Sequence, residues 1–320
     1  MAAPHRKDRI LAVHSGALGD CVLFGHLLSR LGGDVPDGRG SPRICLVARG
    51  EIAGLLEGLG MAHRSLDFDA LPIQEIFGDD DLNRCELPRL LGPHDRLISC
   101  FATGNRVAEG RLAAVCGAQT ACFLPVRPAP ECGAHLLDLW CDMLGMAPRA
   151  GPPHPWPVPA EWTAQAGQAM AALGIGRRSR YYAIHPGAGS PAKCWPLESF
   201  AALAGRLGNA VIVLGPVEAD LWPAEAVASL AGRLAVLKCP SLKTLAGVLA
   251  GAAGYVGNDS GVSHLAAALG SPAVTLFGPT RPEHFAPIGA RTRVVSSASL
   301  ADITVQDVLA ALGQLARPHA

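Results

Sequence analysis

The chain has 320 residues, 49% of them hydrophobic, and its 27 Lys/Arg balance 27 Asp/Glu, so its formal net charge is zero. This balance argues against a protein whose main function is to bind nucleic acid or an anionic membrane through bulk charge, so any anion-binding site must be local. The length is sufficient for two cores of about 150 residues each, and we expect two domains.

The first half of the chain alternates short apolar strands with helices. Residues 10–14 form a predicted strand that leads through a glycine-containing turn into an apolar-periodic helix at residues 21–31. The pattern repeats, with strands at 43–48, 96–101 and 120–123 and helices at 51–59, 107–116 and 134–144. Such alternation indicates a parallel sheet covered by helices.

A proline-rich stretch at residues 147–159 interrupts this pattern. Proline neither propagates a helix nor fills a central strand, so we place a linker there, between domains 1–150 and 160–320. The second domain continues with strands at 181–185, 210–214, 234–237, 254–256 and 273–277 and helices at 198–207, 218–230, 242–250, 260–269 and 305–315. We therefore predict the α/β class, with two Rossmann-like domains whose parallel sheets face a central cleft. Whether the last helix packs back towards the first domain stays open.

The turn that follows strand 254–256 has the composition of an anion site. Asn258 or Asp259 can cap the next helix, and the small residues Ser260 and Gly261 leave its first N–H groups accessible. These donors and the positive end of the helix dipole attract a phosphate. His264 follows one turn later on the same helix face. Taken alone, such a histidine is more often a satisfied, partly buried side chain.

A glycine-rich loop follows strand 181–185 and contains Gly187, Ser190 and Lys193. Lysine is a common phosphate partner, and Ser190 can add a hydroxyl group. The alternative is an ordinary surface loop with a solvated lysine. The spacing is not that of a Walker A motif.

Two carboxylates follow other predicted strands. Glu218 can accept hydrogen bonds from ribose hydroxyls, as an acidic residue does in many nucleotide sites, or it can be a helix N-terminal charge that interacts with the dipole. Asp20 is the best candidate for a general base. Its alternative role is that of a helix N-cap.

Other chemistries have weaker support. Asp67-Phe68-Asp69 and Asp79-Asp80-Asp81 lie between predicted elements, where solvated loop charges are expected more often than magnesium ligands, so we predict no metal site. No Gly-x-Ser-x-Gly elbow is present. The ten cysteines show neither zinc spacing nor a disulfide framework, as is typical of a reducing compartment. With no long apolar segment, we predict a cytoplasmic protein and leave transient contact with the inner membrane open.

Together these motifs resemble glycosyltransferase family 9, the heptosyltransferases of lipopolysaccharide core synthesis. The fragments that carry the resemblance are, in order, Leu18-Gly19-Asp20, His185-Pro186-Gly187-Ala188, Lys193-x-Trp195-Pro196, Gly215-Pro216-x-Glu218, Gly257-Asn258-Asp259-Ser260-Gly261-x-x-His264 and Leu276-Phe277-Gly278-Pro279-Thr280. Each fragment is weak alone, but their order and spacing are specific.

The resemblance implies a GT-B fold and metal-independent, inverting transfer of a heptose-type sugar from an ADP-sugar, which is a co-substrate and not a cofactor. Asp20 would deprotonate the acceptor, a cell-envelope glycan or glycolipid, and Lys193 would stabilise the leaving diphosphate. The remaining donor-binding residues implied are Gly187, Ser190, Glu218, Asp259, Ser260, Gly261 and His264. The first domain would bind the acceptor, with Gly19, Arg49 and Arg106 as candidates.

Two other functions remain open at this point. One is a GT-B enzyme with a different nucleotide sugar, such as a UDP-sugar transferase or an epimerase. The other is a non-catalytic sugar-nucleotide or glycan-binding module. In all three cases the predicted partners are small molecules or glycans and not nucleic acid.

Overall fold

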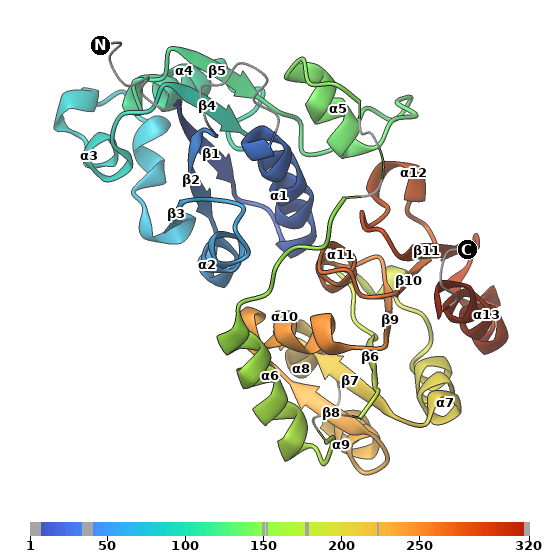
Figure 1. The fold of residues 1–320 in the computed structure, drawn as a ribbon. Helices are drawn as coiled ribbons and strands as arrows, with labels where there is room; N and C mark the ends of the chain where they lie inside the picture. The colour runs from blue at the N-terminus through green and yellow to red at the C-terminus, as the bar shows by residue number, and fades with distance from the viewer. Residues whose placement is uncertain are drawn as a thin grey trace, which may run out of the picture. The chain divides into compact units, whose positions relative to one another are not determined.

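Two parallel sheets organise the computed structural model, which describes residues 8–33, 41–148, 151, 153–176, 179–222 and 224–316. The chain divides into two compact units, Met1–Arg149 and Ala150–Ala320. Helices flank the sheet in each unit (Figure 1). The predicted α/β class with two Rossmann-like parallel sheets is confirmed. The cleft between them stays a prediction.

The first unit contains a five-stranded sheet in the order β3-β2-β1-β4-β5. Its strands are β1 (Arg9–His14), β2 (Arg43–Ala48), β3 (Arg64–Asp67), β4 (Arg96–Ser99) and β5 (Thr120–Phe123). Strand β1 lies in the centre and pairs in parallel with β2 and β4, so that Ile10 lies opposite both Ile44 and Arg96. Because helices cover both faces of such a sheet, the middle of this central strand, Ile10 to Val13, is apolar and buried.

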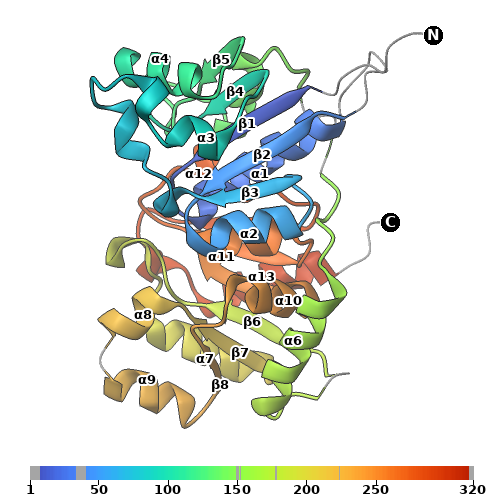
Figure 2. The ribbon, with the colours of Figure 1, turned by 90° about the vertical axis from the view of Figure 1, so that its left-hand side faces the viewer.

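The helices of the first unit are α1 (Leu18–Gly33), α2 (Gly50–Gly58), α3 (Leu87–Leu91), α4 (Arg106–Val115) and α5 (Leu136–Met143). Helices α1 and α5 pack against each other. Helix α2 packs beside β3 (Figure 2). His14, Phe24 and Trp140 join β1, α1 and α5 in one buried cluster of rings. This cluster fixes the start of α1 relative to the end of β1.

The second unit contains a six-stranded sheet in the order β11-β10-β9-β6-β7-β8. Its strands are β6 (Tyr182–His185), β7 (Ala210–Leu214), β8 (Ala235–Lys238), β9 (Gly254–Asn258), β10 (Ala273–Phe277) and β11 (Thr292–Ser296). All of the pairings are parallel. Strands β7, β9 and β10 are buried throughout, as expected when helices cover both faces.

The helices of the second unit are α6 (Ala160–Ala172), α7 (Leu197–Leu207), α8 (Pro216–Leu221), α9 (Ala224–Ala231), α10 (Leu242–Gly251), α11 (Gly261–Ala268), α12 (Pro282–Phe285) and α13 (Val305–Ala316). Helix α10 packs against α6 and α11, and α13 packs against α7, β10 and β11. Phe200 of α7 and Val308 of α13 belong to one core with Ile212 of β7 and Val274 of β10. The last helix is therefore an integral part of the second unit's core.

Several elements differ from the sequence-based expectation. The predicted helix 218–230 is two helices, α8 and α9, because Trp222 adopts an extended backbone at the end of α8. Trp222 precedes a proline, which disfavours the helical conformation at that position. Strands β3 and β11 and helix α6 were not predicted. Helix α6 packs against α10 at Gly247, where an added Cβ would lie 2.4 Å from the Trp162 carbonyl oxygen.

The ten cysteines form no disulfide, and six of them are buried: Cys21, Cys45, Cys85, Cys100, Cys116 and Cys141. None of the helices in the described ranges has both the length and the apolar character needed to cross a membrane.

Candidate active site

The carboxyl ends of β6 and β9 mark the topological switch point of the second sheet. The two strands are neighbours, with Ile184 opposite Val256. The chain nevertheless leaves β6 towards β7 on one side and leaves β9 towards β10 on the other. Ligands of open α/β sheets bind outside the strand ends at such a point. The predicted lysine loop and the predicted anion turn both begin there.

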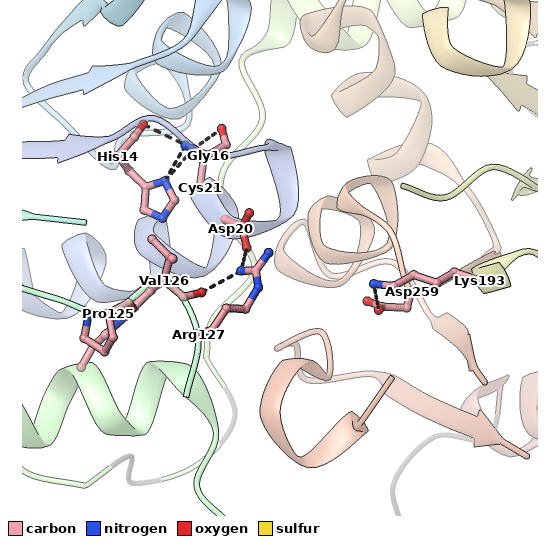
Figure 3. Close-up of polar contacts among 10 residues, drawn as sticks. His14, Gly16, Asp20, Cys21, Pro125, Val126, Arg127, Lys193 and Asp259 are labelled. Atoms are coloured by element: carbon pink, nitrogen blue, oxygen red, sulfur yellow. Dashed lines mark hydrogen bonds and ion pairs between the residues drawn. The ribbon is translucent and has the colours of Figure 1, made fainter. Parts of the chain in front are cut away.

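Lys193 and Asp259 form an ion pair at this switch point. Lys193 ends a short 3-10 helix, Pro191–Lys193, and its Nζ donates to Oδ2 of Asp259 at 2.8 Å (Figure 3). The Asp259 side chain is 9% exposed and that of Lys193 is 32% exposed. Thr280, which follows β10, also donates to Asp259 Oδ2, at 2.9 Å. Lys193 is therefore held in place by a buried carboxylate, unlike the solvated loop lysine considered as the alternative.

Asn258, the last residue of β9, ties the anion turn to the lysine loop. Its buried side chain accepts a hydrogen bond from the Trp195 backbone N–H at 3.0 Å. Its Nδ2 donates to the backbone carbonyls of Pro186 at 2.8 Å and Gly187 at 3.3 Å. A buried amide with both ends bonded holds its neighbours in one arrangement. The Asn258 amide therefore fixes the anion turn and the lysine loop relative to each other.

Helix α11 begins later than predicted, with Ser260 as its N-cap residue and Gly261 as its first residue. The expected cap by Asn258 or Asp259 is wrong, because both side chains are bonded to the lysine loop instead. The Ser260 side chain makes no capping hydrogen bond to the helix backbone. The N-terminus of α11 therefore lacks a side-chain cap. His264 lies within this helix and is buried.

Glu218 lies in the first turn of α8 and is buried. Its Oε2 accepts from the Gly215 N–H at 2.7 Å, as expected for the helix N-terminal role considered above. The carboxylate also faces the lysine loop, because an added Cβ at Gly187 would lie 1.8 Å from Glu218 Oε1. A side chain at position 187 would therefore require the Glu218 side chain to move. Burial lowers the pKa of the neighbouring His185, against the opposing effect of the Glu218 charge.

Asp20 lies in the first turn of α1, which starts at Leu18, so it occupies a position inside the helix and not the N-cap considered above. Its Oδ1 accepts from the Arg127 guanidinium at 2.9 Å (Figure 3). Arg127 follows β5 and also donates to the Val126 carbonyl. The Asp20 side chain is 22% exposed, whereas that of Arg127 is 59% exposed. The candidate base is thus accessible and oriented by a cation.

His14 is the last residue of β1 and is close enough to Asp20 to feel its charge. Its Nδ1 accepts from the Gly16 N–H at 3.0 Å, and Nε2 has no hydrogen-bond partner among the described residues. Burial lowers the pKa of His14 from 6.5 to about 4, although the Asp20 charge acts in the opposite direction. Burial and the same charge raise the pKa of the Cys21 thiol to about 12. Near neutral pH the His14 imidazole and the Cys21 thiol are therefore both uncharged.

The predicted acceptor-binding residues lie on three different elements of the first unit. Gly19 is the second residue of α1, and Arg106 is the exposed first residue of α4. Arg49 precedes α2, pairs with Asp69 at 3.5 Å and lies over the Phe68 ring at 5.5 Å. Their role in acceptor binding stays a prediction.

The acidic clusters have structural roles in the first unit. Asp67 and Asp81 cap short 3-10 helices, and the Asp80 carbonyl accepts from Arg111. Within the part of the chain that the structure describes, no group of three or more His, Cys, Asp or Glu side chains is arranged to hold a metal ion.

Comparison with known families agrees with these motifs. The profile of glycosyltransferase family 9 (heptosyltransferase) matches residues 124–310, more than half of the chain. The chain belongs to glycosyltransferase family 9. The resemblance predicted from the sequence is confirmed. The match begins at residue 124 and therefore does not include Asp20.

Similar proteins include lipooligosaccharide heptosyltransferase 2 of Haemophilus influenzae, which is 33% identical over 113 residues. That match spans 33% of this chain and 33% of the relative, so the chain aligns with only a third of that relative's length.

The fold is similar to that of a family 9 glycosyltransferase from Veillonella parvula, with a TM-score of 0.78, 21% identity, and 98% and 99% of the two chains covered. It is also similar to the Escherichia coli ADP-heptose lipopolysaccharide heptosyltransferase II, with a TM-score of 0.74, 20% identity, and 96% and 98% covered. These likenesses confirm the predicted GT-B fold.

Sequence reasoning missed three parts of the site. Arg127 was not predicted, although it follows a strand end where ligand-facing residues of α/β sheets gather. Thr280 was noted within a family fragment but received no role. Asn258 was predicted as a cap, because a local pattern cannot show that its side chain reaches a loop 63 residues away.

Proposed function

We propose that this protein is a metal-independent inverting glycosyltransferase that moves a heptose-type sugar from an ADP-sugar to a cell-envelope glycan or glycolipid. The observation that carries the proposal is the Lys193 ammonium, which is held by buried Asp259 at the switch point beside the N-terminus of α11. A cation and a helix N-terminus together suit a diphosphate. Family membership and the ADP-heptose enzyme with a similar fold support the choice of donor.

The second unit would hold the donor. Lys193, Ser190 and the N–H groups near Ser260 and Gly261 would contact the diphosphate. Glu218 would accept from the ribose hydroxyls, and the lack of a side chain at Gly187 leaves the loop room beside that carboxylate. Asp259 and His264 would orient the loop or contact the donor sugar. The buried side chains at these positions are fixed before the ligand arrives, which reduces the entropy cost of binding.

The first unit would activate the acceptor. Asp20 accepts the proton of the acceptor hydroxyl as that oxygen forms a bond to the anomeric carbon of the donor sugar. The bond between this carbon and the phosphate oxygen breaks, and its electron pair stays on ADP. Attack from the face opposite the leaving ADP inverts the configuration. General-base catalysis of this kind contributes about 100- to 10,000-fold to the rate.

Arg127 would orient Asp20 before the acceptor arrives. The guanidinium directs Oδ1 through its hydrogen bond, and the acceptor hydroxyl then takes a position on the same carboxylate. Gly19, Arg49 and Arg106 remain the candidates for acceptor contacts. The guanidinium groups of Arg49 and Arg106 suit an acceptor that carries phosphate or carboxylate.

No metal is needed in this scheme, because Lys193 and the N-terminus of α11 stabilise the charge that grows on the diphosphate. Transfer should therefore proceed unchanged in excess EDTA. Loss of activity that added magnesium restores would contradict this part of the proposal.

We also propose a cytoplasmic location, with transient contact at the inner face of the inner membrane.

The test is incubation with ADP-heptose and candidate acceptors, read by the mass increase of the acceptor. Asp20→Asn keeps the shape of the side chain but removes the base, so transfer should fall at least about 100-fold. Its affinity for ADP should stay within about twofold of wild type, since Asp20 contacts the acceptor. Near wild-type turnover of this variant would refute the assignment of the base. Calorimetric titration with ADP, UDP and GDP tests the donor base, and a preference for UDP would refute the ADP assignment.

A further inference from the structure

Three loops of the second unit meet on one carboxylate oxygen. Oδ2 of Asp259 accepts from Lys193 Nζ at 2.8 Å and from Thr280 Oγ1 at 2.9 Å. The three residues follow β6, β9 and β10, which are adjacent strands of the sheet. The network therefore spans the full width of the switch point and one strand beyond it.

Asp259 and Lys193 differ in their exposure. The Asp259 side chain is 9% exposed and that of Lys193 is 32% exposed. Leaving a buried carboxylate without a hydrogen-bond or ion-pair partner costs free energy. Such a carboxylate therefore binds its cation firmly unless another hydrogen-bond donor is present. A lysine engaged in this way is less available to a second anion. The Thr280 hydroxyl is a neutral donor to the oxygen that Lys193 also contacts.

We propose that Thr280 is a positioning residue for Lys193. Its hydroxyl keeps Asp259 hydrogen-bonded while the Lys193 ammonium turns to the diphosphate of the donor. The same hydrogen bond draws charge away from Oδ2, which weakens the repulsion between Asp259 and the incoming diphosphate. This inference rests on the proposed function, because it requires a diphosphate at Lys193.

The primary test compares Thr280→Val, which keeps the shape but removes the hydroxyl, with Thr280→Ser, which retains it. ADP affinity, measured by calorimetry, should fall about tenfold in the valine variant, as expected for the loss of one hydrogen bond to a charged group. The serine variant should stay within about twofold of wild type. Thr304→Val is the matched control, because Thr304 donates to Asp307 Oδ2 at the start of α13, and its ADP affinity should not change.

A double-mutant cycle separates positioning from mere structural support. In a Lys193→Met background, Thr280→Val should change ADP affinity by less than about twofold, because its effect passes through Lys193. Weak binding in this background can be read from the thermal shift at millimolar ADP. A further tenfold loss there would overturn the inference and indicate a structural role for Thr280. Amide exchange at β9 and β10 checks that the single variants are folded.

The two proposals fail in different ways. If the wild-type protein does not bind ADP, the proposed donor site is wrong. If wild type binds ADP and Thr280→Val binds it equally well, only the positioning role is wrong. With ADP-heptose as substrate, Thr280→Val should lower kcat/KM for the donor and leave the KM for the acceptor unchanged, whereas a general loss of structure would change both.

Discussion

Gly187→Ala is the most direct test of how the lysine loop and helix α8 fit together. A Cβ at this position would lie 1.8 Å from Glu218 Oε1 and 2.2 Å from Glu218 Cδ. Both distances are far below van der Waals contact, so the carboxylate must move. The loop cannot easily move instead, because the Gly187 carbonyl accepts from buried Asn258.

The expected cost follows from what Glu218 loses. Its hydrogen bond from the Gly215 N–H involves a charged group, and losing such a bond costs about 1.5–3 kcal/mol. Residual overpacking adds about 1–3 kcal/mol. We therefore expect a loss of about 2.5–6 kcal/mol in the free energy of unfolding of the second unit. If Glu218 holds the ribose, ADP affinity should also fall about tenfold or more.

Amide exchange followed by mass spectrometry at β6 and β7 measures this stability locally, and calorimetry measures ADP affinity. Gly189→Ala is the control in the same loop, because no atom lies within 4 Å of the Cβ that it would add. Its stability should change by no more than about 0.5 kcal/mol. Gly187→Ala combined with Glu218→Ala should be no less stable than Glu218→Ala alone. Wild-type stability of Gly187→Ala, or additive losses in the double variant, would refute the packing argument.

Two further predictions concern the first unit. The pKa of His14 in the folded protein, about 4, lies below its ordinary value of 6.5. Between these two pH values the unfolded chain therefore binds more protons than the folded protein. The free energy of unfolding should accordingly fall by about 3 kcal/mol in total as the pH falls from 6.5 towards 4. His14→Asn, which keeps an acceptor for the Gly16 N–H, should remove this slope in urea titrations at several pH values, and an unchanged slope would mean that His14 does not cause it. Arg127→Met should slow transfer about tenfold, because Asp20 loses the cation that orients it. The free energy of unfolding should change by less than about 1 kcal/mol, because the Arg127–Asp20 ion pair is solvent-accessible. A transfer rate equal to that of wild type would exclude an orienting role for Arg127.

The alternation of strands and helices predicted the main architecture because buried parallel strands leave a strong apolar signal. The prediction failed where that signal was weak. Strand β3 is partly exposed along its length, and β11 is half exposed, so neither reads as a buried run. Helix α6 follows a proline-rich stretch and is rich in alanine, and its position depends on a close approach at Gly247 of α10. No local pattern contains that contact.

For the candidate site too, one part could be predicted from the sequence and another could not. Strand-end loops identified Lys193, Glu218, Asp259 and Asp20, because chemistry in α/β proteins gathers at the carboxyl ends of strands. The pairings among these residues were not predictable. Lys193 and Asp259 are 66 residues apart, and Arg127 and Asp20 are 107 residues apart, so only the folded sheet brings each pair together. The capping role considered as the alternative for Asp20 was local, and the structure shows a long-range ion pair instead.

The Asn258 side chain has a consequence for how this protein can vary in evolution and in engineering. Its amide joins segments 63 and 72 residues away in the sequence, so the anion turn and the lysine loop are complementary parts. If only the anion turn were exchanged for that of a homologue, its side chains would not match the hydrogen-bonding groups of the lysine loop. Substitutions at position 258 should therefore co-vary with the backbone conformation at 186–195, and exchanges of donor specificity within the family should succeed when both segments are transferred together.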